Sequence, residues 1–190
     1  MTSIAAMPDL SIVSRILFAS LVLMLAGCAS QDIAQYAQRK PEFDPRIFFS
    51  GDLTAHGVVK NRSGEVTRHF NATIEAYWNN GVGTLEERFV FDDGEIQYRT
   101  WTLRPEPEGG YIATAGDVVG QGRARVAGNA MNLQYTLRIN YRGDPLDIAV
   151  DDWMYRVDDN TVINESVLSK FGFRVGSIQL AIVRQPHLRQ

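Results

Sequence analysis

Cysteine and histidine are scarce in this sequence, which holds one cysteine and three histidines among 190 residues. A single cysteine excludes an internal disulfide, and His56, His69 and His187 do not follow the spacing of a zinc site. Runs of basic residues are also lacking, and 19 Lys and Arg against 22 Asp and Glu leave a net charge of −3. Because nucleic acid binding needs clustered cations, that class of function is excluded. We expect no metal, no cofactor and no nucleic acid partner.

Long apolar runs are equally rare, and the one example covers residues 16–26, directly after Arg15. A run of this length is too short to span a bilayer, which takes about 20 residues, but it suits the core of a secretory signal peptide. The run ends in Leu25-Ala26-Gly27-Cys28, which resembles the lipobox of bacterial lipoproteins. We therefore predict that residues 1–27 form a cleaved signal peptide and that the Cys28 thiol is lipidated, with palmitate labelling as its signature. The start residue is Met1 or Met7.

The predicted lipid anchor determines where the protein is expected to lie. In such lipoproteins the amino group of the cysteine is acylated too, and three chains exceed the two signals that stable anchoring requires. Ala29 and Ser30 follow the cysteine, where an aspartate would be expected for retention in the inner membrane. By resemblance to enterobacterial sorting, this pattern favours the outer membrane. The sequence thus predicts a protein of the bacterial envelope that faces the periplasm and has the membrane as its partner.

Residues 28–42 are mostly small and polar and predict a lipidated tether, whereas residues 43–190 have the length of one domain. In residues 66–78 and 131–141, every second side chain is apolar except Arg68, which is the pattern of a half-buried antiparallel strand. Gly, Asn and Asp separate such runs and supply the positive φ angles of tight hairpins. We expect about ten strands, at residues 52–60, 65–78, 84–91, 95–104, 110–117, 119–127, 130–141, 146–157, 161–170 and 174–183.

Consecutive hairpins form a meander with two exposed edges, and closing the meander into a barrel removes both. A two-sheet sandwich would need longer crossover connections than the sequence offers. The pattern therefore predicts an all-β domain that forms a single antiparallel up-and-down barrel of eight to ten strands with little helix.

Six segments in order resemble a domain-of-unknown-function family of proteobacterial lipoproteins. The resemblance covers nearly the whole predicted mature chain and implies a lipocalin-like fold. Members of the family are often encoded beside genes for fatty-acyl and cyclopropane-type lipid modification, which suggests a lipid ligand. No catalytic residue is implied, since none is established for the family. The segments begin at Phe43 (FDPRIFFSG), Asp93 (DGE), Arg99 (RTWTL), Gly116 (GDVVG), Asp151 (DDWMY) and Ser169 (SKFGFRVG).

Three charged residues share the phase of apolar neighbours on their strands and are therefore expected to point inward: Arg68, Glu87 and Asp152. Buried charges are costly unless they are paired. We predict a partly wet interior in which Arg68 pairs with Glu87 or Asp152. Such a pair either closes one end of the barrel or orients a ligand, and in the second case these three residues bind it. We expect the Arg68 guanidinium to bind the head group of an acidic lipid.

Other residues have structural interpretations. Asp117, beside Gly116, is expected to bond local backbone amides at a bend, and His69 is expected to face solvent. Trp153 and Tyr155 are expected to pack outside the barrel against the arm of residues 43–49. Lys170 and Arg174 frame a tight connection and serve either as rim charges facing lipid headgroups or as solubilising groups.

Three functions remain open at this stage. The favoured one is a periplasmic module that binds an acyl or other apolar ligand in envelope lipid metabolism. The first alternative is a non-enzymatic envelope scaffold with a filled core. The second is a small hydrolase or isomerase that uses Glu87, Asp152 or Asp117 as acid and base. A binding barrel requires a hollow interior, whereas a scaffold has its interior packed solid.

Overall fold

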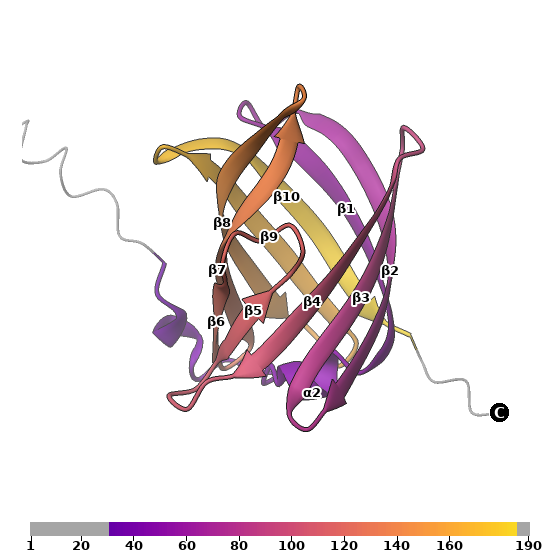
Figure 1. Cartoon of the computed structure of the whole chain (residues 1–190). Coiled ribbons are helices and arrows are strands. Elements are labelled where there is room, and N and C mark those ends of the chain that lie inside the picture. The colour runs from indigo at the N-terminus through magenta and orange to yellow at the C-terminus, as the bar shows by residue number, and fades with distance from the viewer. Residues whose placement is uncertain (1–30, 186–190) are drawn as a thin grey trace, which may run out of the picture. The chain divides into compact units, whose positions relative to one another are not determined.

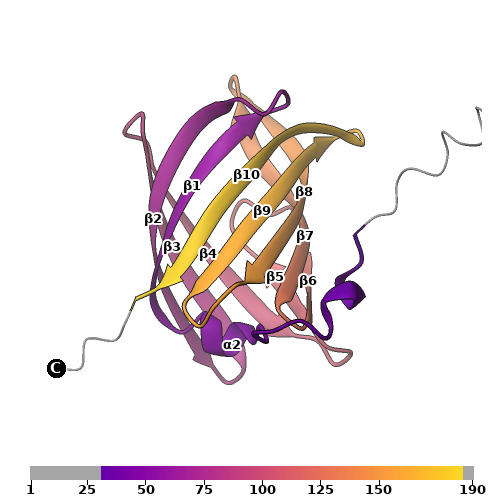
Figure 2. The ribbon, with the colours of Figure 1, turned by 180° about the vertical axis from the view of Figure 1, so that it is seen from behind.

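The computed structural model describes residues 31–185, which form a closed barrel of ten antiparallel strands (Figures 1 and 2). Each strand pairs with its neighbours in sequence, and β1 pairs with β10 to close the ring. The predicted all-β up-and-down barrel is confirmed, and all ten predicted strands are present. They are β1 (Gly51–Asn61), β2 (Val66–Asn79), β3 (Val82–Phe91), β4 (Ile96–Pro105), β5 (Tyr111–Thr114), β6 (Gly122–Ala127), β7 (Ala130–Tyr141), β8 (Asp144–Arg156), β9 (Thr161–Lys170) and β10 (Phe173–Arg184).

Local sequence explains how the ring turns and closes. Asn80 and Gly81 have φ angles of 50° and 79°, so their two-residue turn joins β2 to β3 with the twist that a hairpin requires. A Cβ atom at Gly57 on β1 would lie 2.5 Å from the Phe70 ring and 2.7 Å from Leu180 Cβ. Only glycine therefore lets β1 approach both of its neighbours at the seam of the barrel.

A short helix, α2 (Pro45–Phe48), closes one end of the barrel (Figure 1). The Asp44 side chain caps it by accepting a hydrogen bond from the Arg46 amide, and proline at the first helical position fits because no amide hydrogen is needed there. Phe43, Phe48 and Phe49 are buried around it and pack edge-on or tilted. The expectation that this arm packs outside, against Trp153 and Tyr155, is wrong. Its three rings are apolar enough to fill the end of the barrel.

The ring of Tyr36 packs against Trp153 and Tyr155 instead, at centroid distances of 5.8 and 5.4 Å. Tyr36 ends a single 3-10 turn, η1 (Ile33–Tyr36), which packs against β6 and β7. Further along, the Phe43 amide donates to the Gly128 carbonyl oxygen at 2.7 Å. The segment predicted as a tether therefore contacts the barrel from η1 onward. Cys28 and the predicted signal peptide lie outside the described residues.

The largest departure from the expected strands lies between β5 and β6, where residues 115–121 leave the sheet. Val118 makes an isolated bridge to Leu137, and the Arg138 amide donates to the Asp117 carbonyl oxygen at 2.8 Å. The segment thus lies along β7 near the barrel end opposite α2. We call this the open end, and it carries the turns β1–β2, β3–β4, β7–β8 and β9–β10 (Figure 2). No helix in the described part is long and apolar enough to cross a membrane.

Candidate functional site

The barrel encloses a cavity of about 610 Å³, within the roughly 300–1,000 Å³ range of small-molecule sites. Phe49 lines it beside α2, whereas Arg68, Glu95 and Asn140 line it near the open-end turns. Phe49 and the neighbouring phenylalanines therefore close the cavity at one end. At its other end the cavity reaches the open end of the barrel.

Most of the cavity wall is apolar, because the inward position of each strand repeats every second residue. The same alternation that identified the strands supplies these side chains. Examples from five strands are Ile74, Leu85, Phe89, Trp101, Leu133 and Ile182.

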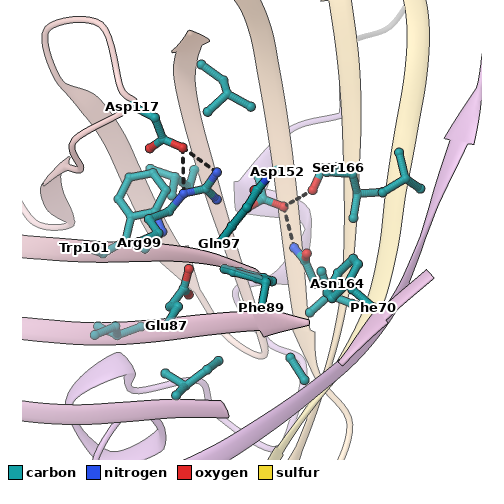
Figure 3. A pocket seen from close by; sticks show the side chains of 18 of the residues that line it. Phe70, Glu87, Phe89, Gln97, Arg99, Trp101, Asp117, Asp152, Asn164 and Ser166 are labelled. Atoms are coloured by element: carbon teal, nitrogen blue, oxygen red, sulfur yellow. Dashed lines mark hydrogen bonds and ion pairs between the residues drawn. The ribbon is translucent and has the colours of Figure 1, made fainter. Parts of the chain in front are cut away.

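Polar side chains interrupt this wall, and Figure 3 shows how they lie around the cavity. Arg99 on β4 donates from Nε and Nη2 to Asp117 Oδ2, at 3.0 and 2.6 Å. The other carboxylate oxygen of Asp117 is buried and has no hydrogen-bond partner among the described residues. The expectation that Asp117 bonds local backbone amides is therefore wrong, since the bend at residues 115–121 turns its side chain to Arg99.

Asp152 lies on β8, directly opposite Ser166 in the pairing with β9. Its Oδ1 atom accepts hydrogen bonds from Ser166 Oγ at 2.8 Å and from the Asn164 amide (Figure 3). Burial raises the pKa of Asp152 to about 6, although both hydrogen bonds and the charge of Arg99 favour the ionised form. The two donors show how the barrel accepts this carboxylate without a direct ion pair.

Glu87 lies on β3, directly opposite Arg99 in the pairing with β4. Burial raises the pKa of Glu87 to about 7, against the attraction of the Arg99 guanidinium. The Glu87 side chain is only half-buried by surface area, because the cavity itself gives it accessible surface. The protein surrounding the cavity still separates the carboxyl group from bulk water, so we expect it to titrate near neutral pH.

Together these groups make the inner cavity acidic. We call the polar cluster the seven side chains Glu87, Arg99, Asp117, Tyr135, Asp152, Asn164 and Ser166, all of which line the cavity. It holds three carboxyl groups and one guanidinium. Burial also raises the pKa of Tyr135, so its hydroxyl stays neutral. The cluster can accept hydrogen bonds from a guest and can exchange protons near neutral pH, but its one cation is already paired.

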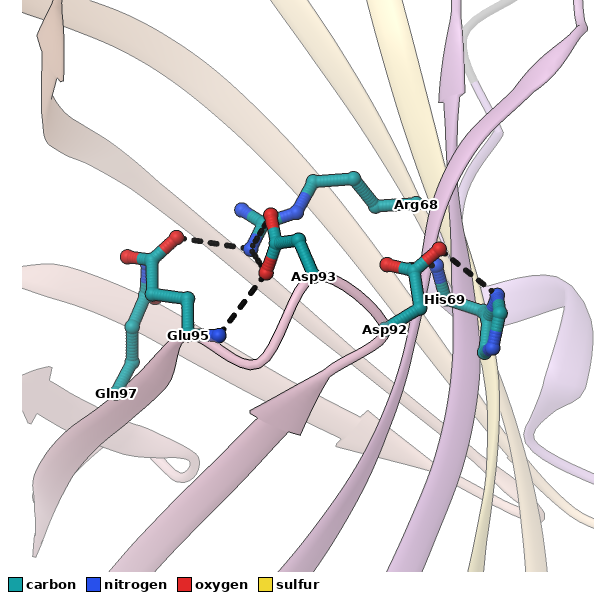
Figure 4. A network of polar contacts seen from close by, with 6 residues as sticks. All are labelled: Arg68, His69, Asp92, Asp93, Glu95 and Gln97. Atoms are coloured by element: carbon teal, nitrogen blue, oxygen red, sulfur yellow. Dashed lines mark hydrogen bonds and ion pairs between the residues drawn. The ribbon is translucent and has the colours of Figure 1, made fainter.

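Arg68 lines the same cavity at its mouth, and Figure 4 shows its contacts with Asp93 and Glu95. Its Nη2 atom lies 2.8 Å from carboxylate oxygens of both Asp93 and Glu95, and its guanidinium lies 3.8 Å from the centre of the Phe91 ring. The predicted pairing with Glu87 or Asp152 is wrong. Position along the strand decides this, because Arg68 sits near the start of β2, beside the β3–β4 turn.

The structure thus brings Arg68, Glu87 and Asp152 to one cavity but not to one another. The interior cation is Arg99, which the sequence interpretation did not select. The signal was present, since Arg99 has the same phase as Trp101 and Leu103.

Other predicted residues have separate partners. The His69 side chain is 64% exposed, as expected, and lies 3.2 Å from Asp92 (Figure 4). The Lys170 ammonium donates to the Asp147 carbonyl oxygen, and Arg174 donates to Ser177 Oγ. Within residues 31–185, no group of three His, Cys, Asp or Glu side chains is placed to hold a metal ion.

The family model described as protein of unknown function (DUF3833) matches residues 22–184. The chain belongs to this family. No curated protein matches the sequence significantly.

Two solved structures share the barrel. The S-type phycobiliprotein lyase CPES from Guillardia theta aligns with a TM-score of 0.57 at 11% identity, over 83% of this chain and 99% of that one. A DUF3598 protein of unknown function from Nostoc punctiforme aligns with a TM-score of 0.54 at 12% identity, over 83% of this chain and 53% of that one. These likenesses confirm the lipocalin-like fold. At such identities they show the fold alone.

Proposed function

We propose that this DUF3833 protein binds one small ligand with an apolar body inside its barrel. The observation that carries the proposal is the cavity of about 610 Å³, stopped by buried phenylalanines at one end and reaching the open end. A scaffold with a filled core needs no such space, and close-packed interiors rarely leave voids larger than a water molecule. The hollow interior therefore favours binding over the scaffold.

The charges in the cavity restrict the ligand's polar group. An anionic head in the polar cluster would meet three carboxyl groups and one guanidinium that Asp117 already engages. The other two guanidiniums that line the cavity, those of Arg68 and Arg138, are also paired with carboxylates. A head that donates hydrogen bonds, either neutral or cationic, would satisfy the free Oδ1 atom of Asp117 and the carboxyl group of Glu87. We therefore propose an acyl or other apolar ligand whose polar head donates hydrogen bonds. This proposal takes the place of the expectation that Arg68 binds an acidic head.

Native mass spectrometry of the purified chain tests binding directly. The unmodified chain should carry a non-covalent adduct that organic solvent extracts. Ala55→Phe adds a ring to the cavity wall and should remove the adduct, whereas Thr54→Phe, on the other face of β1, should retain it. Circular dichroism checks that both variants keep the strand signal. A chain that is empty in every preparation would favour the scaffold.

Displacement of an apolar fluorescent probe tests the charge of the head. Among compounds of equal chain length, an alkylamine and an alcohol should displace the probe at lower concentrations than a carboxylate does. Asp152→Asn removes one negative charge and should narrow the difference between amine and carboxylate. A carboxylate that binds best to the unmodified chain would contradict the proposed head group.

We further propose that Cys28 is lipidated and that the barrel functions in envelope lipid metabolism, on the periplasmic side of the outer membrane. The support is the apolar run that ends in Leu25-Ala26-Gly27-Cys28. Palmitate labelling of cells that produce the chain or its Cys28→Ser variant tests the modification, and separation of the two envelope membranes tests the location. Equal labelling of both chains would refute lipidation.

An enzymatic function is the second candidate, and one observation favours it. The pKa of Glu87, at about 7, suits a group that both donates and accepts a proton at neutral pH. Once the extracted ligand is known, turnover of that compound by the unmodified chain and by Glu87→Gln separates a binding protein from an isomerase or hydrolase.

A further inference from the structure

Two neighbouring hairpins at the open end carry exposed aromatic side chains. Phe171 and Phe173 of the β9–β10 hairpin are 88% and 68% exposed, and Tyr141 of the β7–β8 hairpin is 52% exposed. The hairpins are adjacent because β8 pairs with β9, and both extend from the barrel end opposite α2 (Figures 1 and 2). We call Tyr141, Phe171 and Phe173 the aromatic rim. Single exposed apolar side chains are ordinary, but three exposed aromatic rings on neighbouring, projecting turns indicate an interaction surface.

The backbone conformation of the β9–β10 turn does not explain why residue 171 is a phenylalanine. Phe171 and Gly172 form a two-residue turn in which Phe171 has a φ of 51°, a conformation that is rare for a bulky side chain. The corresponding turn at the closed end places Asn80 there, with a φ of 50°, and asparagine is the favoured residue in such turns. At the open end the sequence therefore has a large exposed ring where the turn itself favours asparagine.

Basic side chains lie beside the rim. The Arg142 guanidinium lies 5.2 Å from the centre of the Tyr141 ring, and the Lys170 ammonium lies 4.9 Å from that of Phe171. Arg174 follows Phe173, and none of these three cations makes an ion pair with another described residue. Aromatic rings beside cations that are not paired with a carboxylate match the interface of a bilayer that carries anionic headgroups.

We propose that the aromatic rim docks on the surface of a bilayer with anionic headgroups. Ile139 and Asn140 line the cavity mouth and precede Tyr141 on the same strand, so docking brings the mouth to the bilayer. An apolar ligand can then move between bilayer and cavity with little exposure to water. The surface exists whether or not a ligand is bound, so this inference goes beyond the proposed function.

The N-terminal segment joins the barrel away from the aromatic rim. η1 packs against β6 and β7, and its Tyr36 contacts β8 through Trp153. The rim lies on the hairpins formed by β7 to β10. η1 therefore lies near the closed end, beside the turn at Gly128 between β6 and β7, and it leaves the aromatic rim at the other end uncovered.

A reporter at the rim tests docking. In the full chain carrying Cys28→Ser, Asp144→Cys places a polarity-sensitive dye at the first residue of β8, next to the β7–β8 turn. Glu108→Cys places the dye on the β4–β5 turn at the closed end. Vesicles of phosphatidylcholine and phosphatidylglycerol should shift the emission of the first reporter to the blue and leave the second unchanged. Vesicles of phosphatidylcholine alone should bind more weakly, by roughly fivefold for each cation at the surface.

Phe171→Asn separates docking from folding. Asparagine suits the turn, so the melting temperature should stay the same or rise by about 2–4 °C, while vesicle binding should weaken by about tenfold because the inserted ring is lost. Ile47→Ser/Val157→Ser removes two exposed apolar side chains at the closed end, which are 57% and 51% exposed. This control should bind vesicles like the parent.

Two kinds of outcome would overturn the inference: a rim that does not dock on vesicles, and a rim that a second copy of the chain covers. The first is an Asp144→Cys reporter that does not respond to anionic vesicles, or equal vesicle binding by the parent and Phe171→Asn. The second is vesicle-free self-association of the parent that Phe171→Asn abolishes, because the rim would then be occupied by a second copy of the chain.

Discussion

Replacing Glu87 by glutamine should stabilise the protein at alkaline pH and leave it nearly unchanged at acidic pH. Burial raises the pKa of Glu87 from its ordinary 4.5 to about 7 in the folded chain. Between these values the unfolded chain has lost a proton that the folded chain retains, so the free energy of unfolding falls as pH rises. At 1.36 kcal/mol per pH unit, the total cost above pH 7 is about 3 kcal/mol. Glutamine does not ionise and avoids this cost.

Urea denaturation at pH 5 and pH 8 measures the effect. Glu87→Gln should exceed the parent by about 2–3 kcal/mol at pH 8 and by less than about 1 kcal/mol at pH 5. Glu75→Gln is the matched control, because Glu75 lies exposed on the outer face of the adjacent strand β2, and it should not change the pH dependence. A Glu87→Gln variant whose stability difference from the parent is the same at both pH values would refute the reasoning.

Three further changes test other parts of the structure. Phe48→Ala removes a fully buried ring from the phenylalanines that fill the closed end of the barrel. It should lower the free energy of unfolding, measured in urea, by about 3–5 kcal/mol. Gly128→Ala would place a Cβ atom 1.8 Å from the Tyr36 carbonyl oxygen, so η1 should detach and trypsin should cleave after Arg39 faster than in the parent. Asp152→Asn should remove a loss of stability that the parent shows as pH rises from about 4 to about 6, because burial raises the pKa of Asp152; an unchanged pH profile would contradict this.

Sequence periodicity predicted the barrel well because a half-buried strand records its two faces directly in its residues. The same signal placed Glu87 and Asp152 on the inner wall correctly. It did not predict that β5 would end at Thr114, since the bend at residues 115–121 depends on contacts with β7, which is distant in sequence. Asp44-Pro45 was a local signal for the start of α2, but a four-residue helix has too little periodicity to be recognised.

The pairing of Arg68 failed for a different reason. Alternation gives the side of the sheet on which a residue lies but not its depth along the barrel axis. Depth depends on register. Arg68 lies near the start of β2, beside Asp93 and Glu95, whereas Arg99 lies directly opposite Glu87. Of two charged residues that face the inside of the barrel, one can therefore lie at the mouth of the cavity and the other deep inside it.

Glu87 and Phe171 share one property, since each sits where the fold alone would favour another residue. A filled apolar interior would avoid the cost of the Glu87 carboxyl group, and asparagine would suit the turn at Phe171 better. Departures of this kind are expected where a sequence serves binding as well as folding. Phe171 lies at the open end and Glu87 lies on the wall of the cavity that reaches it. A ligand entering from a bilayer would meet the aromatic rim first and the carboxyl groups afterwards, so the two predicted stabilising substitutions should each weaken a different step of the same uptake.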